Sequence, residues 1–277
     1  MLSWQYAVAV ACGLGIIAAV IRIRRRRDRL DAWGGLATEA ALLFGLYGLW
    51  QFAGSFTVMS PAGALAKGRW LWHAERVLHL PGETSVQRLF LPHPVLVQAS
   101  NLYYDILHFP VLGVCLIWLY AWHRSSYPAI RTTVALFTGA SLLIQLIPVA
   151  PPRLLPETGL VDTAVQYGQS VYSWQGGFDA DQYSAMPSVH VGWALIVTVA
   201  VITTSRNKWR WLATAYPLLT LLSVTVTANH FWLDGAAAGV LVALVLAVQR
   251  LARSLRSGKS RESAQVKPVP GEMSMRS

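Results

Sequence analysis

Residues 185–190 read Ala-Met-Pro-Ser-Val-His, residues 229–234 read Asn-His-Phe-Trp-Leu-Asp, and each stretch opens a long apolar run. Both therefore place a histidine at the mouth of a hydrophobic segment. A titratable group at the end of a membrane span is expensive to bury, so its presence usually marks a function. The two stretches predict two membrane helices that begin beside chemically active side chains.

The composition of the whole chain indicates a membrane protein. Of its 277 residues, 54% are hydrophobic and only 13% are charged, whereas soluble domains carry about 25% charged residues. The twelve tryptophans and ten tyrosines suit a protein with two lipid–water interfaces. We therefore expect an all-α fold, a polytopic bundle of membrane helices. Seven segments are apolar enough to span: 4–21, 35–58, 102–122, 132–149, 188–204, 211–229 and 234–250.

The basic residues predict how this bundle is oriented. The net charge is +10, but the basic residues form blocks beside apolar spans, so no nucleic-acid partner is expected. Alternating the spans from an outside N-terminus puts 18 of the 23 lysines and arginines into cytoplasmic segments. Such an asymmetry follows the positive-inside rule. We predict a multi-pass plasma-membrane protein with a cytoplasmic C-terminus and with both histidine stretches on the extracytoplasmic side.

His230 and Asp234 are four residues apart, a spacing that brings side chains together on one face of a helix. A carboxylate there can accept the Nδ1–H of the imidazole, which fixes the tautomer and leaves Nε2 free as a nucleophile. The alternative is a histidine–aspartate pair that only packs a helix end.

His190 and Ser188 follow Pro187 at the start of an apolar run, which is a helix-start signal with Ser188 as the N-cap. Backbone N–H groups at such a start attract an anion, and a histidine in the first turn can protonate a leaving oxygen. The alternative is an interfacial histidine on a capped helix.

Arg153 lies just outside the fourth predicted span, in the sequence Pro-Pro-Arg-Leu. The planar guanidinium group suits bidentate binding of a phosphate. The alternative is an arginine that reaches towards lipid headgroups.

At these positions the chain resembles the type 2 phosphatidic acid phosphatase (PAP2) superfamily, and within it the branch of inositolphosphorylceramide synthases and their bacterial relatives. Pro187-Ser188-Val189-His190 matches the second family motif, His230 and Asp234 match the end of the third, and Arg153 matches the first. Two positions depart from the pattern. Leu146 stands where the family has a lysine, and Val224 where it has an arginine.

The resemblance implies a six-helix catalytic core, to which this chain adds an N-terminal membrane helix. It implies that His230 forms a phosphohistidine, that Asp234 orients it, and that His190 is the general acid and base. Arg153 and Ser188 would bind the phosphate, and neither a metal nor another cofactor is expected. The expected domains are 1–34 (N-terminal helix and basic segment), 35–252 (catalytic domain) and 253–277 (disordered basic cytoplasmic tail).

Four polar residues recur every three or four positions near the start of the third span: Asn101, Tyr104, Asp105 and His108. The spacing puts them on one helix face. We expect either a wall of the substrate cavity, with a partner for the catalytic group, or hydrogen bonds between helices. Two ligands are too few to indicate a metal site, so none is predicted at Asp105 and His108.

The expected partner is a lipid-linked phosphate, of polyprenyl, glycerolipid or phosphoinositide type, within the surrounding membrane lipids. If water attacks the phosphoenzyme, the protein is a lipid phosphatase. If an alcohol attacks, it is a phosphotransferase that moves a phosphoinositol or sugar-phosphate headgroup. A non-catalytic lipid-binding or transport protein is the alternative of another class, which the apolar midplanes of the spans disfavour.

Overall fold

The computed structural model describes residues 4–23, 37–42, 44–45, 48, 61–170 and 182–265, and these are helices and connecting turns apart from one isolated bridge, Val149 to Ser184. In chain order the elements are α1 (Trp4–Ile23), α3 (Pro61–Val77), α4 (Glu83–Phe90), α5 (Pro94–Leu102), η1 (Tyr103–Leu107), α6 (His108–Trp122), α7 (Tyr127–Gln145), η2 (Pro152–Leu154), η3 (Pro156–Thr158), α8 (Thr163–Gln166), α10 (Val189–Thr204), η5 (Lys208–Thr214), α11 (Ala215–Val226) and α12 (Trp232–Gln265). Most of the predicted span 35–58, the arginine block after Ile23 and the last residues of the predicted tail lie outside the described residues.

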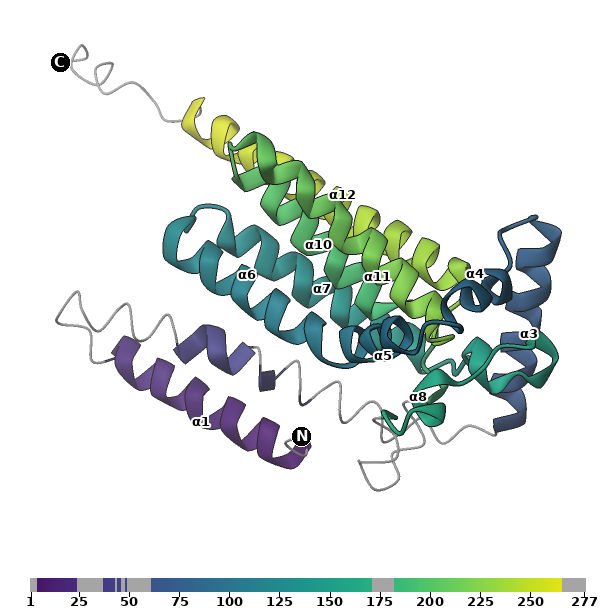
Figure 1. Cartoon of the computed structure of the whole chain (residues 1–277). Helices are drawn as coiled ribbons and strands as arrows, with labels where there is room; N and C mark the ends of the chain where they lie inside the picture. Colours follow the sequence, from purple (N-terminus) through teal and green to yellow (C-terminus); the bar gives the residue numbers. More distant parts are fainter. Residues whose placement is uncertain are drawn as a thin grey trace, which may run out of the picture.

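Helix α10 lies at the centre of the bundle, in contact with α6, α7, α11 and α12, and Figure 1 shows these helices side by side. Leu119, Phe137 and Ile196 fill the space between them and are fully buried. A Cβ on Gly192 of α10 would lie 1.9 Å from Cζ of Phe137. The glycine therefore lets α7 approach α10 closely, as small residues do in membrane bundles.

Three described stretches are long and apolar enough to cross a membrane: Pro94–Trp122, Tyr127–Gln145 and Trp232–Leu255. Two shorter apolar helices accompany them, Gln5–Ile21 and Val189–Thr204. Large hydrophobic side chains such as those of Ile117, Leu143 and Val248 point outwards from the bundle. The structure is thus the all-α membrane helical bundle that the composition predicts.

The ends of several spans differ from the prediction. The span expected to begin at residue 102 begins at Pro94, because α5, η1 and α6 follow one another without a break. Helix α7 is shifted towards the N-terminus relative to the predicted 132–149. The predicted span 211–229 is split between η5 and α11, and α12 continues past residue 250 to Gln265.

Short elements cover one end of the bundle: α3, α4, α8, η2 and η3 (Figure 1). Between residues 61 and 102 the chain forms three separate helices, α3, α4 and α5, where prolines and glycines interrupt the sequence. The cover is tied together by hydrogen bonds, such as Ala150 N–H to Ala64 O at 3.0 Å and Thr84 Oγ1–H to Thr158 O at 2.9 Å.

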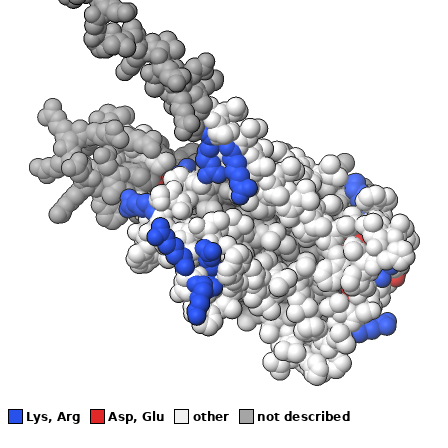
Figure 2. All heavy atoms as spheres, turned by 90° about the horizontal axis from the view of Figure 1, so that it is seen from above, with Lys and Arg blue, Asp and Glu red and all other residues white. Residues whose placement is uncertain are grey.

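Charged side chains differ between the two ends. Figure 2 shows lysines and arginines gathered towards one end, whereas basic and acidic side chains appear together at the other. The turn between α6 and α7, which holds Arg124, and the α10–η5 connection, which holds Arg206, lie opposite the end covered by α3 and α4 (Figure 1). The short elements and the basic turns therefore occupy opposite ends of the helices.

Candidate active site

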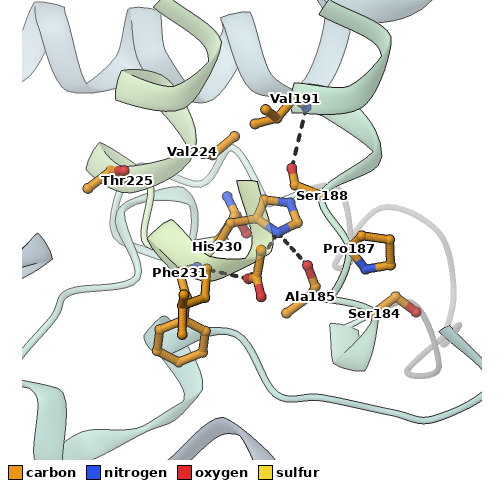
Figure 3. A network of polar contacts seen from close by, with 12 residues as sticks. Ser184, Ala185, Pro187, Ser188, Val191, Val224, Thr225, His230 and Phe231 are labelled. Atoms are coloured by element: carbon orange, nitrogen blue, oxygen red, sulfur yellow. Dashed lines mark hydrogen bonds and ion pairs between the residues drawn. The ribbon is translucent and has the colours of Figure 1, made fainter. Parts of the chain in front are cut away.

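Ser188 caps helix α10, as the sequence predicts. Its side-chain oxygen accepts from the backbone N–H of Val191 at 3.4 Å, a contact drawn in Figure 3. The backbone N–H of Ser188 donates to the carbonyl oxygen of Asp234 at 3.1 Å. This bond joins the first turns of α10 and α12, so the two sequence stretches form one structural unit.

His230 lies in the short turn between α11 and α12, two residues before α12 begins at Trp232. Its Nδ1 lies 2.7 Å from the carbonyl oxygen of Ala185 and 3.5 Å from Oδ2 of Asp234 (Figure 3). The predicted contact between His230 and Asp234 is therefore present, but His230 precedes the helix, and the shorter contact of its Nδ1 is with Ala185. Residues 229–231 are not helical, and Oδ2 of Asp234 also accepts from Phe231 N–H at 2.8 Å.

The contact with Ala185 determines the tautomer of His230. A carbonyl oxygen can only accept, so Nδ1 carries the hydrogen and Nε2 carries the lone pair. His230 is buried, and its Nε2 has no hydrogen-bond partner among the described residues. A buried nitrogen lone pair that no neighbour satisfies is unusual in a folded protein. It is available for attack on a substrate or for accepting a proton.

His190 lies close to His230, with 5.9 Å between the ring centroids. The centroid of the Tyr104 ring lies 4.3 Å from that of the His190 ring and 6.1 Å from that of the His230 ring. Nδ1 of His190 is buried and, within the described part of the chain, has no hydrogen-bond partner. The first turn of α10 and the turn before α12 thus bring two imidazoles to one place.

The predicted polar stripe on the third span divides between two surroundings. His108 lies 4.8 Å from the His190 ring and its Nδ1 is 3.0 Å from the hydroxyl of Tyr216, so His108 and Tyr104 belong to the histidine cluster. Asn101 instead bonds the outer connection, donating to Gln169 Oε1 and accepting from Thr163 Oγ1–H, each at 2.8 Å.

The division of the stripe has a local cause. The span forms a π-helix over Tyr103–Leu107, which changes the helical phase between Asn101 and His108. Asp105, within the π-helix, is partly buried and close enough to Arg153 for their charges to interact.

Arg153 is fixed against the turn that carries His230. Its Nε–H donates to Asn229 Oδ1 at 2.8 Å and its Nη1–H to Asp162 Oδ2 at 3.1 Å. Its backbone N–H donates to Ala228 O at 3.0 Å. Asn229 is a site residue that the sequence reasoning missed, although its place directly before His230 was a usable signal.

The same turn contains a strained residue. Ala228 has a φ of 54°, a left-handed conformation that is unfavourable by about 1–2 kcal/mol for a residue with a Cβ. Such conformations persist where the surrounding contacts fix them, and they are concentrated at functional sites. Here the fixed contact is with the backbone of Arg153.

No three histidine, cysteine, aspartate or glutamate side chains of the described residues gather closely enough to hold a metal ion. The independence from metals that the family resemblance implies stays a prediction, which chelation can test.

The described helices and the paired histidines define a membrane-embedded helical bundle with a histidine-based site at one end. A family model described as the PAP2 superfamily matches residues 69–248, well over half of the chain. The chain belongs to the PAP2 superfamily, and membership indicates a phosphatase or phosphotransferase. Comparisons with curated proteins and with solved structures give no match.

Proposed function

We propose that this protein is a lipid phosphatase or phosphotransferase that acts at the extracytoplasmic face on a lipid-linked phosphate or phosphodiester, through a phosphohistidine on His230. The observation that carries the proposal is the state of His230. Its Nδ1–H is held by Ala185 and its buried Nε2 has no partner among the described residues. This is the arrangement that a nucleophilic imidazole requires.

In the first step, Nε2 of His230 attacks phosphorus and the bond from phosphorus to the leaving oxygen breaks. His190, in its protonated form, gives its proton to that oxygen. The imidazole of His230 becomes positively charged because it keeps the hydrogen on Nδ1. The carboxylate of Asp234, 3.5 Å from Nδ1, stabilises this charge.

In the second step, an incoming hydroxyl gives its proton to His190 while its oxygen attacks phosphorus and the P–N bond breaks. This restores both histidines to their starting states. Arg153 and the capped start of α10 at Ser188 bind the phosphate oxygens during both steps. Tyr104 and Asp105 border the place where the substrate lies.

A second candidate differs only in the acceptor: an alcohol in place of water, so that a phosphoinositol or sugar-phosphate headgroup is transferred. The observation in its favour is the small number of fixed cations. Leu146 and Val224 occupy the positions at which family members have a lysine and an arginine, and Arg153 already interacts with Asp162. A site with few cations suits a singly charged phosphodiester better than a doubly charged phosphomonoester.

Purified protein incubated with a panel of lipid phosphates and phosphodiesters tests both candidates. Release of inorganic phosphate indicates the phosphatase, and headgroup exchange with an added alcohol indicates the transferase. Acid-labile radioactivity on the protein after brief incubation with a phosphorus-labelled substrate would report the phosphohistidine. Turnover of no substrate in a folded preparation contradicts the proposal, and activity that EDTA abolishes and a divalent ion restores contradicts metal independence.

A further inference from the structure

Side chains of α3 and α4 form hydrogen bonds with both ends of the turn that carries His230. At one end, the side chain of Gln87 in α4 donates through Nε2 to Val226 O at 2.9 Å. At the other end, Glu75 in α3 accepts through Oε1 from Leu233 N–H at 2.8 Å. Both side chains are 1% exposed. One external segment, residues 75–87, therefore contacts the last residue of α11 and the first turn of α12.

Gln87 has a second function in this arrangement. It also donates to Val161 O at 2.8 Å and accepts from Val161 N–H at 2.9 Å. All three hydrogen bonds are to backbone groups, so Gln87 fixes the outer connection next to Asp162, the partner of Arg153. The segment thus connects the phosphate-binding side of the site with the turn that carries the nucleophile.

Glu75 lies beside a second buried carboxyl group, that of Glu83, which is also 1% exposed. The two carboxyl groups are close enough for each to influence the protonation of the other, and Arg76 Nη2–H donates to Glu83 Oε2 at 2.9 Å. The oxygens Glu75 Oε2 and Glu83 Oε1 are buried and have no hydrogen-bond partner within the described ranges. A proton on one of the two carboxyl groups would make that group a hydrogen-bond donor as well as an acceptor.

The surrounding charges decide which group holds that proton. Glu83 of α4 and Asp234 of α12 face Glu75 with negative charge, and Arg76, the cation beside them, is bonded to Glu83. Arg153 of the adjacent η2 is engaged by Asn229 and Asp162. Burial, together with the nearby carboxyl group of Glu83, raises the pKa of Glu75 to about 9. At neutral pH, Glu75 is therefore the uncharged acid.

We infer that Glu75 is a positioning residue: its buried carboxyl group accepts from the Leu233 amide and holds the first turn of α12, so that Asp234 and His230 keep their geometry. Leu233 is the residue directly before Asp234. Its amide is one of the first-turn N–H groups that no helical carbonyl can reach. Displacing a supporting contact by about 1 Å can reduce a rate about 100-fold. This inference rests on the proposed phosphoryl-transfer function.

Two substitutions separate the positioning role from simple stabilisation. Glu75→Gln keeps an acceptor for Leu233 N–H and a donor for Glu83 but cannot ionise, so activity at pH 7 should stay within about threefold of wild type. Wild-type kcat should fall as the pH rises through about 9, because a second anion then faces Glu83 and Asp234. In Glu75→Gln this fall should be absent. Glu75→Ala should lower kcat by about 10- to 100-fold with little change in KM.

Glu157→Gln is the matched control, since Glu157 is a partly exposed glutamate that pairs with Arg69 of α3, the helix that also carries Glu75. The kcat of Glu157→Gln at pH 7 and the alkaline fall in its kcat should both resemble those of wild type. An unchanged kcat in Glu75→Ala overturns the inference, as does an alkaline fall in Glu75→Gln that coincides with that of wild type. If Glu75→Ala does not fold, the pH profile of Glu75→Gln decides alone.

Hydrogen–deuterium exchange provides a readout that needs no substrate. A peptide covering residues 226–234 should exchange faster in Glu75→Ala than in wild type, Glu75→Gln or Glu157→Gln. Unchanged exchange overturns the inference even if the enzyme is active. Conversely, faster exchange supports it even if no tested phosphate is turned over, so its failure and that of the proposed function are distinguishable.

Discussion

The carbonyl oxygen of Ala185 lies 2.7 Å from Nδ1 of His230, closer than the carboxylate of Asp234. A backbone group of one sequence stretch thus selects the tautomer of the histidine in the other. No side-chain substitution at residue 185 can remove this acceptor. The roles of orienting the imidazole and of balancing its charge are therefore divided between two residues, and this division shapes the predictions.

Replacing His230 with alanine should abolish turnover, with a loss on the order of 10⁶-fold, as expected when a nucleophile is removed. The measurement is kcat on the best substrate of the panel. His93, an exposed histidine at the start of α5, is the control, and His93→Ala should keep full activity. Substantial turnover in a folded His230→Ala protein would rule out the nucleophile assignment.

Asp234→Asn should lower kcat by less than the about 10⁴-fold seen where an asparagine imposes the wrong tautomer on a catalytic histidine. The reason is that Ala185 still accepts from Nδ1, so only the charge is lost. KM should change little. A loss as large as that of His230→Ala would instead mean that the carboxylate, and not the carbonyl, fixes the imidazole.

His190→Ala should slow the reaction strongly for an alkyl phosphate, whose leaving oxygen needs a proton. An activated aryl phosphate has a leaving group that departs without one, so the defect should shrink. The measurement is the rate of phosphoenzyme formation with both substrates. Equal defects would assign His190 to substrate binding and not to proton transfer.

Gly192→Ala should destabilise the protein by about 1–3 kcal/mol, because the new methyl group would lie 1.9 Å from Cζ of Phe137. Thermal unfolding in detergent should show a lower Tm. Gly113→Ala on α6 is the control, since a Cβ there meets nothing within 4 Å. The double substitution with Phe137→Leu should recover part of the loss. A Tm equal to that of Gly113→Ala would show that α7 and α10 separate easily.

The distribution of arginines predicts which side of the membrane the site faces. With Cys12 and Cys115 replaced, a cysteine at the exposed Val165 of α8 should react with an impermeant maleimide in intact cells. A cysteine at Ser205, in the connection after α10, should react only once the membrane is opened. The opposite pattern would put the histidine cluster on the cytoplasmic side.

The sequence was sufficient to predict the parts of the site that are local in the chain. Ser188 is an N-cap because proline and an apolar run flank it, and such signals do not depend on the rest of the fold. Composition was likewise enough to predict the membrane helices, because a chain that crosses lipid must satisfy its own backbone hydrogen bonds and few structures other than helices do so. The sequence also suggested that His190, His230, Asp234 and Arg153 lie at one end of the bundle.

The contacts that fix these residues could not be predicted in the same way. The acceptor for His230 is a backbone carbonyl, which every residue possesses, so no residue type at position 185 indicates it. Glu75 and Gln87 carry no signal because a glutamate or glutamine in a polar stretch is usually solvated. Their burial becomes apparent only when α3 and α4 cover the ends of α11 and α12.

The π-helix at Tyr103–Leu107 also separates two functions along one membrane helix. An α-helix places residues seven apart nearly in line, which would aim Asn101 and His108 at the same neighbour. The wider turn breaks that alignment, so Asn101 faces the connection at Thr163 while His108 faces the imidazole of His190. Deleting a single residue within the π-helix should restore the regular repeat. The part of the helix before the π-helix would then rotate by about 100° relative to the part after it, which would move either the Asn101 amide or the His108 ring out of its present contact.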